Sequence, residues 1–99
     1  PFEEKLERII TQKWIANFHV EGMEAWSEFR RTGYPRLLPA AQNNSGGVIG
    51  EGEFARRAIY PSNEKNSNAE NYYEAVNSDL GGKDTMASRL WWDCNPNTK

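Results

Sequence analysis

Cysteine and histidine are almost absent from the chain, whose 99 residues hold one of each, Cys94 and His19. A single cysteine cannot form an internal disulfide, and a structural zinc site needs four Cys or His ligands. A catalytic Cys–His pair would join two residues 75 positions apart in a sequence with no supporting motif. We therefore expect no metal site, no cofactor and no catalytic residue in this chain.

Basic charge is not in surplus, since 12 Lys and Arg residues stand against 14 Asp and Glu, for a net charge of −2. Proteins that bind nucleic acid gather a basic surplus on one face, so no nucleic-acid partner is expected. The sequence also has no apolar run of 18 residues. It therefore predicts no membrane-spanning helix.

Aliphatic residues are scarce, whereas aromatic residues are plentiful. Leu, Ile and Val number only 13, or 17 with the four Phe, and four Trp and four Tyr add to the aromatic residues. That aliphatic content is low for a self-sufficient core, and the aromatic content is high for a disordered chain. We interpret the chain as part of a larger fold whose remaining portion packs against these rings.

Residues from about 2 to 32 are predicted to form an αα-hairpin. Apolar residues recur at helical spacing in a first segment, Phe2 to about His19, and in a second, about Glu21 to Arg31. Gly33 is suited to a left-handed C-cap, which would end the second helix.

The rest of the chain is predicted to hold one more helix between irregular segments. Residues 33–66 are loop-rich, and Ser67 and Glu70 have the spacing of a capping box before a helix over about 68–80. An aromatic tail follows over 84–95. The expected fold class is mainly α with long irregular loops, an αα-hairpin plus a third helix.

Paired residues supply the candidate functional groups. Trp91–Trp92 and Tyr72–Tyr73 are adjacent aromatics, which cannot both face the same way on a regular element. One ring of each pair is therefore a candidate to face outward, where it could stack on a sugar, although burial is the default. The basic pairs Arg30–Arg31 and Arg56–Arg57 we interpret as supports for loops rather than as anion clamps.

Trp91, Trp92 and Asp93 are the candidate ligand-binding residues, and two interpretations remain open. An outward ring beside a carboxylate would offer a platform for a pyranose with a hydroxyl at its rim. Two buried rings would instead form a plug that closes the C-terminal segment onto the first hairpin. We favour the plug, because Leu90 adds a third apolar group beside the two rings.

An ordered string of short motifs runs through nearly the whole chain. It begins with Gln12–Ala16, Glu24–Trp26 and Arg30–Leu37, continues with Arg56–Arg57, Tyr60–Pro61, Glu64, Asn68 and Asn71, and ends in Gly81–Gly82, Asp84 and Arg89–Asp93. No single piece is specific, but together their order resembles the C-terminal part of SusD/RagB-like proteins.

The resemblance implies that residues 1–99 are a C-terminal fragment, roughly the final fifth, of a TPR-like helical SusD-type fold. Proteins of that family are outer-membrane lipoproteins at the cell surface that capture glycans and sit as a lid on a TonB-dependent transporter. The implied partners are thus a polysaccharide or oligosaccharide and that transporter. The family's lipid-bearing cysteine lies at the mature N-terminus, so Cys94 is not that residue and the anchor is expected outside this chain.

Two other functional classes remain beside a non-enzymatic glycan-capturing protein. A helical hairpin would serve equally well in a helical-repeat module that binds a protein and no glycan. A carbohydrate-active enzyme is the third class, because 14 carboxylates could include a catalytic pair.

Overall fold

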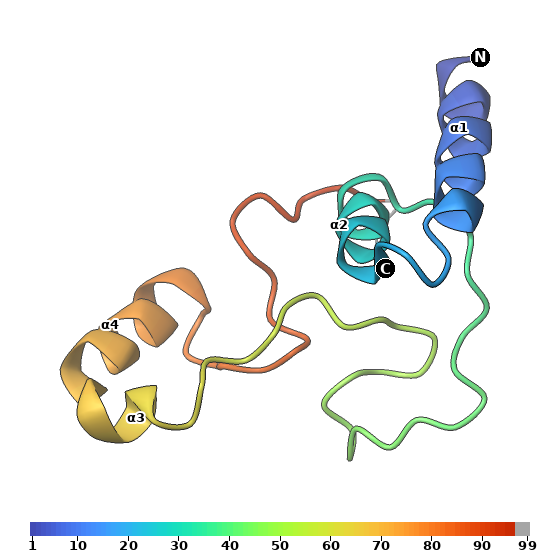
Figure 1. Cartoon of the computed structure of the whole chain (residues 1–99). Helices are drawn as coiled ribbons and strands as arrows, with labels where there is room; N and C mark the ends of the chain where they lie inside the picture. Colours follow the sequence, from blue (N-terminus) through green and yellow to red (C-terminus); the bar gives the residue numbers. More distant parts are fainter. Residues whose placement is uncertain (97–99) are drawn as a thin grey trace. The chain divides into compact units, whose positions relative to one another are not determined.

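The computed structural model describes residues 1–96, which form four α-helices, with long irregular segments between α2 and α3 and after α4 (Figure 1). The helices are α1 (Phe2–Ala16), α2 (Gly22–Thr32), α3 (Glu64–Ser67) and α4 (Ala69–Asp79). Within these 96 residues there is no strand, so the mainly α class with long loops is confirmed. None of these four helices is long and apolar enough to cross a membrane.

The chain divides into two compact units. One comprises Pro1–Leu38 with the segment that starts at Asp93, and the other comprises Pro39–Trp92. We refer to them as the hairpin unit and the loop unit. Each has its own helix pair, α1 with α2 in the hairpin unit and α3 with α4 in the loop unit.

The hairpin unit confirms the predicted pair of helices. Ile10 of α1 and Ala25 and Phe29 of α2 are buried. Beside them Lys13 Nζ lies 3.2 Å from Glu24 Oε1 and 3.6 Å from a carboxylate oxygen of Glu28, which ties the two helices together across the hairpin. Ion pairs of Lys13 therefore lie next to the small apolar contact between the two helices.

The first helix is shorter than predicted, because it ends at Ala16 rather than near His19. Asn17 caps it by donating its backbone N–H to Lys13 O, and its carbonyl then accepts the N–H groups of Val20 and Glu21. These bonds form a tight turn in which His19 has a left-handed φ of 63°. A helical pattern of apolar residues continues into this turn, which is why the sequence placed the end too late.

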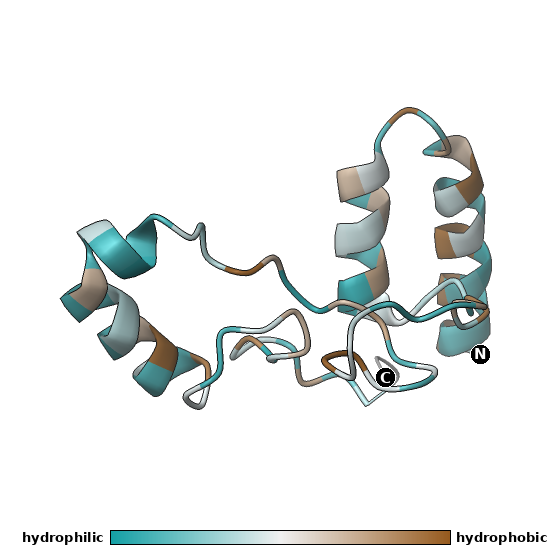
Figure 2. Cartoon of the chain, turned by 90° about the horizontal axis from the view of Figure 1, so that it is seen from below, coloured by the Kyte–Doolittle hydropathy of each residue, from teal (hydrophilic) through white to brown (hydrophobic). Residues whose placement is uncertain are grey.

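The apolar face of α1 is only partly covered. Phe2 and Ile9 belong to the apolar residues that recur at helical spacing along this segment, but they are 74% and 64% exposed. Figure 2 shows hydrophobic segments of α1 interspersed with hydrophilic ones along the helix. Other large apolar side chains are exposed on the hairpin: Ile15, Phe18, Val20 and Met23.

The turn after α2 is fixed by a glycine and by side-chain hydrogen bonds. Gly33 has a left-handed φ of 78° and donates its N–H to Phe29 O at 2.8 Å, which confirms the predicted C-cap. The Tyr34 N–H then donates to the buried Thr32 hydroxyl at 3.1 Å, and the Tyr34 hydroxyl donates to Glu3 Oε2 at 3.0 Å. The segment leaving α2 is thereby attached to the start of α1.

The capping box predicted for the third helix is wrong, although the helix itself is present as α4. One helical turn, α3, precedes α4 and takes in Ser67 as its last residue. The Ser67 hydroxyl therefore donates back to Asn63 O at 2.7 Å, and Asn68 occupies the N-cap position of α4. Val76 and Leu80, which follow Tyr72 at helical spacing, are buried.

Replacing Gly33 tests the turn after α2. Gly33→Ala is expected to lower the free energy of unfolding by about 1–2 kcal/mol, because an L side chain is strained at this left-handed φ. The control is Gly22→Ala, at a helical position where an added Cβ meets no atom within 4 Å. That control should leave stability unchanged or raise it by up to about 0.5 kcal/mol. Thermal unfolding followed by circular dichroism compares the two, and equal losses would contradict the assigned C-cap.

Candidate functional site

The loop unit contains a buried ion pair. Arg57 Nη1 is 2.5 Å from Asp84 Oδ1, and both side chains are largely shielded from solvent. The same Arg57 nitrogen donates to Thr85 O at 3.3 Å. Arg57 precedes α3 and Asp84 follows α4, so the pair joins the two irregular segments on either side of the helices. The interpretation of Arg57 as a support for loops is confirmed.

The Asp84 carboxylate accepts two further hydrogen bonds. Its Oδ1 accepts the Tyr60 N–H at 3.3 Å, and its Oδ2 accepts the Tyr72 hydroxyl at 3.0 Å. Burial alone would raise the pKa of Asp84, but the hydrogen bonds from Arg57, Tyr60 and Tyr72 and the Arg57 charge outweigh it and lower the pKa below its usual value. Burial and the bond to Asp84 raise the pKa of Tyr72. Asp84 is thus held ionised with Tyr72 neutral.

Three tyrosine rings surround this network. The rings of Tyr60 and Tyr72 meet edge to face with centroids 5.8 Å apart, and those of Tyr72 and Tyr73 do so at 5.1 Å. The Arg57 guanidinium carbon lies 5.0 Å from the centre of the Tyr60 ring. Tyr60 is 38% exposed and Tyr73 49% exposed, so both offer ring surface to solvent. The ion pair therefore holds a small aromatic cluster at the surface.

A cleft of about 250 Å³ opens beside these rings, and we call it the tyrosine cleft. Its lining combines aromatic, hydroxyl and charged groups: Ile59, Tyr60, Pro61, Ser62, Lys65, Tyr72 and Asp84. Aromatic walls with a few polar groups are typical of a small-ligand site. A general acid is not provided, because the one carboxylate in the lining is ionised and bonded through both oxygens.

The sequence singled out Tyr72–Tyr73 but did not predict this cleft. Tyr60 and Asp84 are 24 residues apart, and Arg57 and Asp84 are 27 apart. No local pattern fixes such pairings, because they depend on how two irregular segments meet. The available signal was that Arg56–Arg57, Tyr60–Pro61 and Asp84 all belong to the ordered motif string.

The structure separates the three candidates of the aromatic tail. Trp91 is 87% exposed and Trp92 39% exposed, whereas Asp93 is only 4% exposed. With 87% of its surface exposed, Trp91 is not buried as the favoured plug required. The apolar neighbour Leu90 was a poor guide, because a short irregular segment has no periodic face to bury.

Asp93 belongs to the hairpin unit, where its charge acts on Arg30. Burial lowers the pKa of Arg30, and the negative charge of Asp93 opposes that shift. The Arg30 guanidinium carbon also lies 3.8 Å from the centre of the Trp26 ring. The buried carboxylate is thus a structural group of the hairpin unit.

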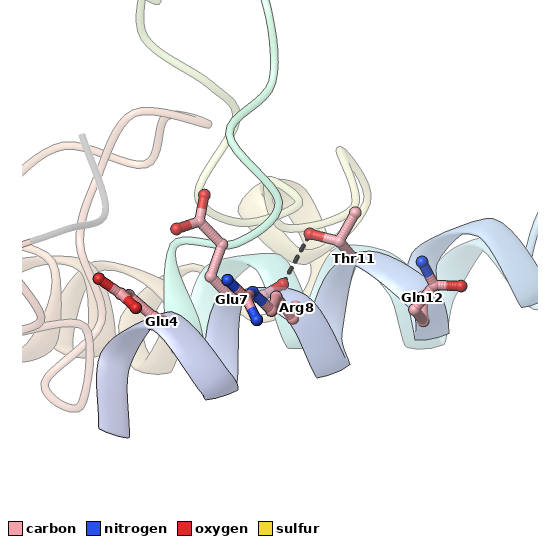
Figure 3. A pocket seen from close by; sticks show the side chains of 5 residues that line it. All are labelled: Glu4, Glu7, Arg8, Thr11 and Gln12. Carbon is pink, nitrogen blue, oxygen red and sulfur yellow. Dashed lines mark hydrogen bonds between the residues drawn. The ribbon is translucent and has the colours of Figure 1, made fainter. Parts of the chain in front are cut away.

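A second hollow, of about 500 Å³, lies along α1 (Figure 3). Its five lining residues are polar or charged: Glu4, Glu7, Arg8, Thr11 and Gln12. Thr11 donates to Glu7 O at 2.6 Å, and the Glu7 carboxylate lies 3.0 Å from Arg36 Nε. Because none of the five lining residues is aromatic, this hollow suits a sugar less well than the tyrosine cleft does.

Metal ligands are not grouped in the described part of the chain. Within residues 1–96, no cluster of three or more His, Cys, Asp or Glu side chains could hold an ion. His19 instead packs in the turn after α1, with its ring centroid 4.1 Å from that of Phe18.

The hydrogen-bond network predicts how Asp84 titrates. Since its folded pKa lies below the unfolded value, its contribution to stability is present above the unfolded pKa and is lost as the pH falls through the folded pKa. We expect NMR titration of the Asp84 carboxyl to give a pKa below the ordinary value of an aspartate, with amide protection in α4 declining on the acid side. An Asp84 pKa at or above that value would contradict the network.

Solved structures similar to this chain include several SusD homologues. A SusD homologue from Bacteroides vulgatus superposes with a TM-score of 0.84 and 45% identity, covering 100% of this chain and 20% of its own. A SusD homologue from Bacteroides thetaiotaomicron gives 0.81 and 46%, over 95% of this chain and 21% of its own. A chitin-binding protein gives 0.73 and 40%, over 91% and 19%. No curated protein matches the chain.

This chain therefore spans about a fifth of the length of its solved relatives. The family model described as SusD-like, SusD and RagB outer membrane lipoprotein, matches residues 1–93. The ordered motif string was thus a correct guide, and the chain belongs to the SusD-like family.

Proposed function

We propose that this chain is part of a glycan-capturing protein of the outer-membrane surface that hands its ligand to a TonB-dependent transporter. The observation that carries the proposal is 40% identity, at a TM-score of 0.73, to a chitin-binding protein, together with the match of this chain to the SusD-like family. Exposed aromatic rings in the loop unit agree with it. Attachment to the membrane would come through the lipid anchor implied by the family's description, outside this chain.

Stacking on aromatic rings is the physical basis of the proposed binding. The C–H face of a sugar is apolar, so it releases water when it covers an exposed ring. Trp91 is the strongest single candidate in the aromatic tail, because 87% of its surface is open. Trp92, at 39% exposed, would add a smaller contact. Asp93 is not proposed to contact the glycan, because this residue is buried.

The chemistry of the cleft supports capture without catalysis. A glycosidase needs one protonated and one ionised carboxyl group on either side of the scissile bond. The tyrosine cleft offers one carboxylate, which is paired with Arg57 and held ionised. We therefore propose a binding protein and not an enzyme.

A protein-binding module is the second candidate, and the hairpin unit supplies the observation that favours it. Ile15, Phe18, Val20 and Met23 are all exposed around one end of the hairpin. Exposed apolar side chains gathered in this way are typical of a surface that packs against another protein segment. This role is compatible with glycan capture by the loop unit.

Replacing Trp91 tests the proposed stacking. Trp91→Ala should weaken glycan binding about tenfold, on the order of 1.4 kcal/mol, and leave the melting temperature nearly unchanged because the ring is exposed. Trp92→Ala should have a smaller effect on binding. The measurement is migration in native gels that contain chitin-derived or other soluble polysaccharides, with thermal unfolding in parallel.

Phe2→Ala is the matched control, since Phe2 is another exposed aromatic ring but lies on α1. It should leave migration unchanged. Retardation that survives in both tryptophan variants would remove these rings from the proposal. Absence of retardation with any glycan would favour the protein-binding module, and release of reducing sugar would point to an enzyme.

A further inference from the structure

The charge of the tyrosine cleft narrows the kind of sugar that would fit it. Two lining residues are charged, Asp84 and Lys65. The Asp84 charge is balanced by the guanidinium of Arg57, 2.5 Å away. Lys65 is exposed at the surface of α3 and makes no salt bridge within the described residues. The cleft therefore presents one uncompensated positive charge to a ligand.

The size of the cleft suits a single sugar ring. At about 250 Å³ it lies below the range of roughly 300–1,000 Å³ that holds drug-sized ligands. The rings of Tyr60 and Tyr72 stand nearly perpendicular, at 75°, so they form two walls of different orientation. Ser62 adds a hydroxyl group to the lining, which can bond to a ring hydroxyl.

We propose that the tyrosine cleft binds an acidic sugar unit of a glycan, with the sugar ring against Tyr60 and Tyr72 and its anionic group paired with Lys65. The inference rests on the proposed glycan-capturing function. It specifies the class of ligand at a second binding position, in addition to the one proposed at Trp91. A carboxylate or a sulfate group would supply the charge equally well. Because the Asp84 carboxylate already accepts three hydrogen bonds and is paired with Arg57, it repels such a group less than a free carboxylate would.

The test compares oligosaccharides that differ only in charge. Cellohexaose is neutral, the β-1,4-linked glucuronic acid hexamer carries carboxylates at the same carbons, and 6-O-sulfated cellohexaose carries sulfates. Isothermal titration at pH 7 should show at least tenfold tighter binding of an acidic hexamer than of the neutral one. The stronger of the two acidic probes then distinguishes a uronate from a sulfated ligand.

Substitutions in the cleft assign the effect to Lys65. Lys65→Gln should abolish the preference for the acidic hexamers, and Lys65→Arg should retain most of it. Lys83→Gln makes the same charge change outside the lining and should keep the preference. Tyr60→Ala should weaken binding of all hexamers, with circular dichroism confirming that each variant is folded.

The outcomes separate this inference from the proposed function. Equal affinity for neutral and acidic hexamers, or an unchanged preference in Lys65→Gln, would overturn the assignment of the cleft. If polysaccharide binding then persists and depends on Trp91, the proposed function stands without this cleft. If no glycan of any kind binds, both fail together.

Discussion

The buried pair of Arg57 and Asp84 is the interaction on which the loop unit depends. Most of this unit is irregular chain, with an apolar core that includes Val76 and Leu80 but few other buried side chains. One carboxylate there receives a guanidinium, a backbone N–H and a tyrosine hydroxyl from three positions. A buried charge tolerates the loss of a partner poorly, so these bonds hold the two irregular segments in one arrangement. The positions of Tyr60 and Tyr72 at the surface depend on that arrangement, because both residues donate hydrogen bonds to Asp84.

The hairpin unit also has few buried aliphatic residues, and polar contacts between distant segments again stabilise it. Its buried apolar contact is small, and polar groups close it at both ends, through Lys13 on one side and through Tyr34 with Glu3 on the other. Large apolar side chains remain outside. In both units, then, hydrogen bonds between distant segments define the structure, and aromatic or apolar surface is left available for a partner or ligand.

The sequence predicted what depends on neighbouring residues. The two helices of the hairpin, the C-cap at Gly33 and the buried face of α4 all follow from periodicity and backbone preference. The capping box at Ser67 failed because an extra turn of helix competed for the same residue. The tyrosine cleft could not be predicted, since it depends on a pairing across 27 residues. Motif order nevertheless predicted the family, and the SusD-like family model, which matches residues 1–93, confirms it.

A double-mutant cycle between Arg57 and Asp84 tests the central claim most directly. Arg57→Met, Asp84→Asn and the double variant would be compared through hydrogen exchange of the α4 amides, which reports local opening free energies. The account predicts a coupling free energy above about 2 kcal/mol at pH 7, because each single change leaves the other group buried without its ionic partner. A coupling within about 0.5 kcal/mol of zero, as expected for independent sites, would contradict it.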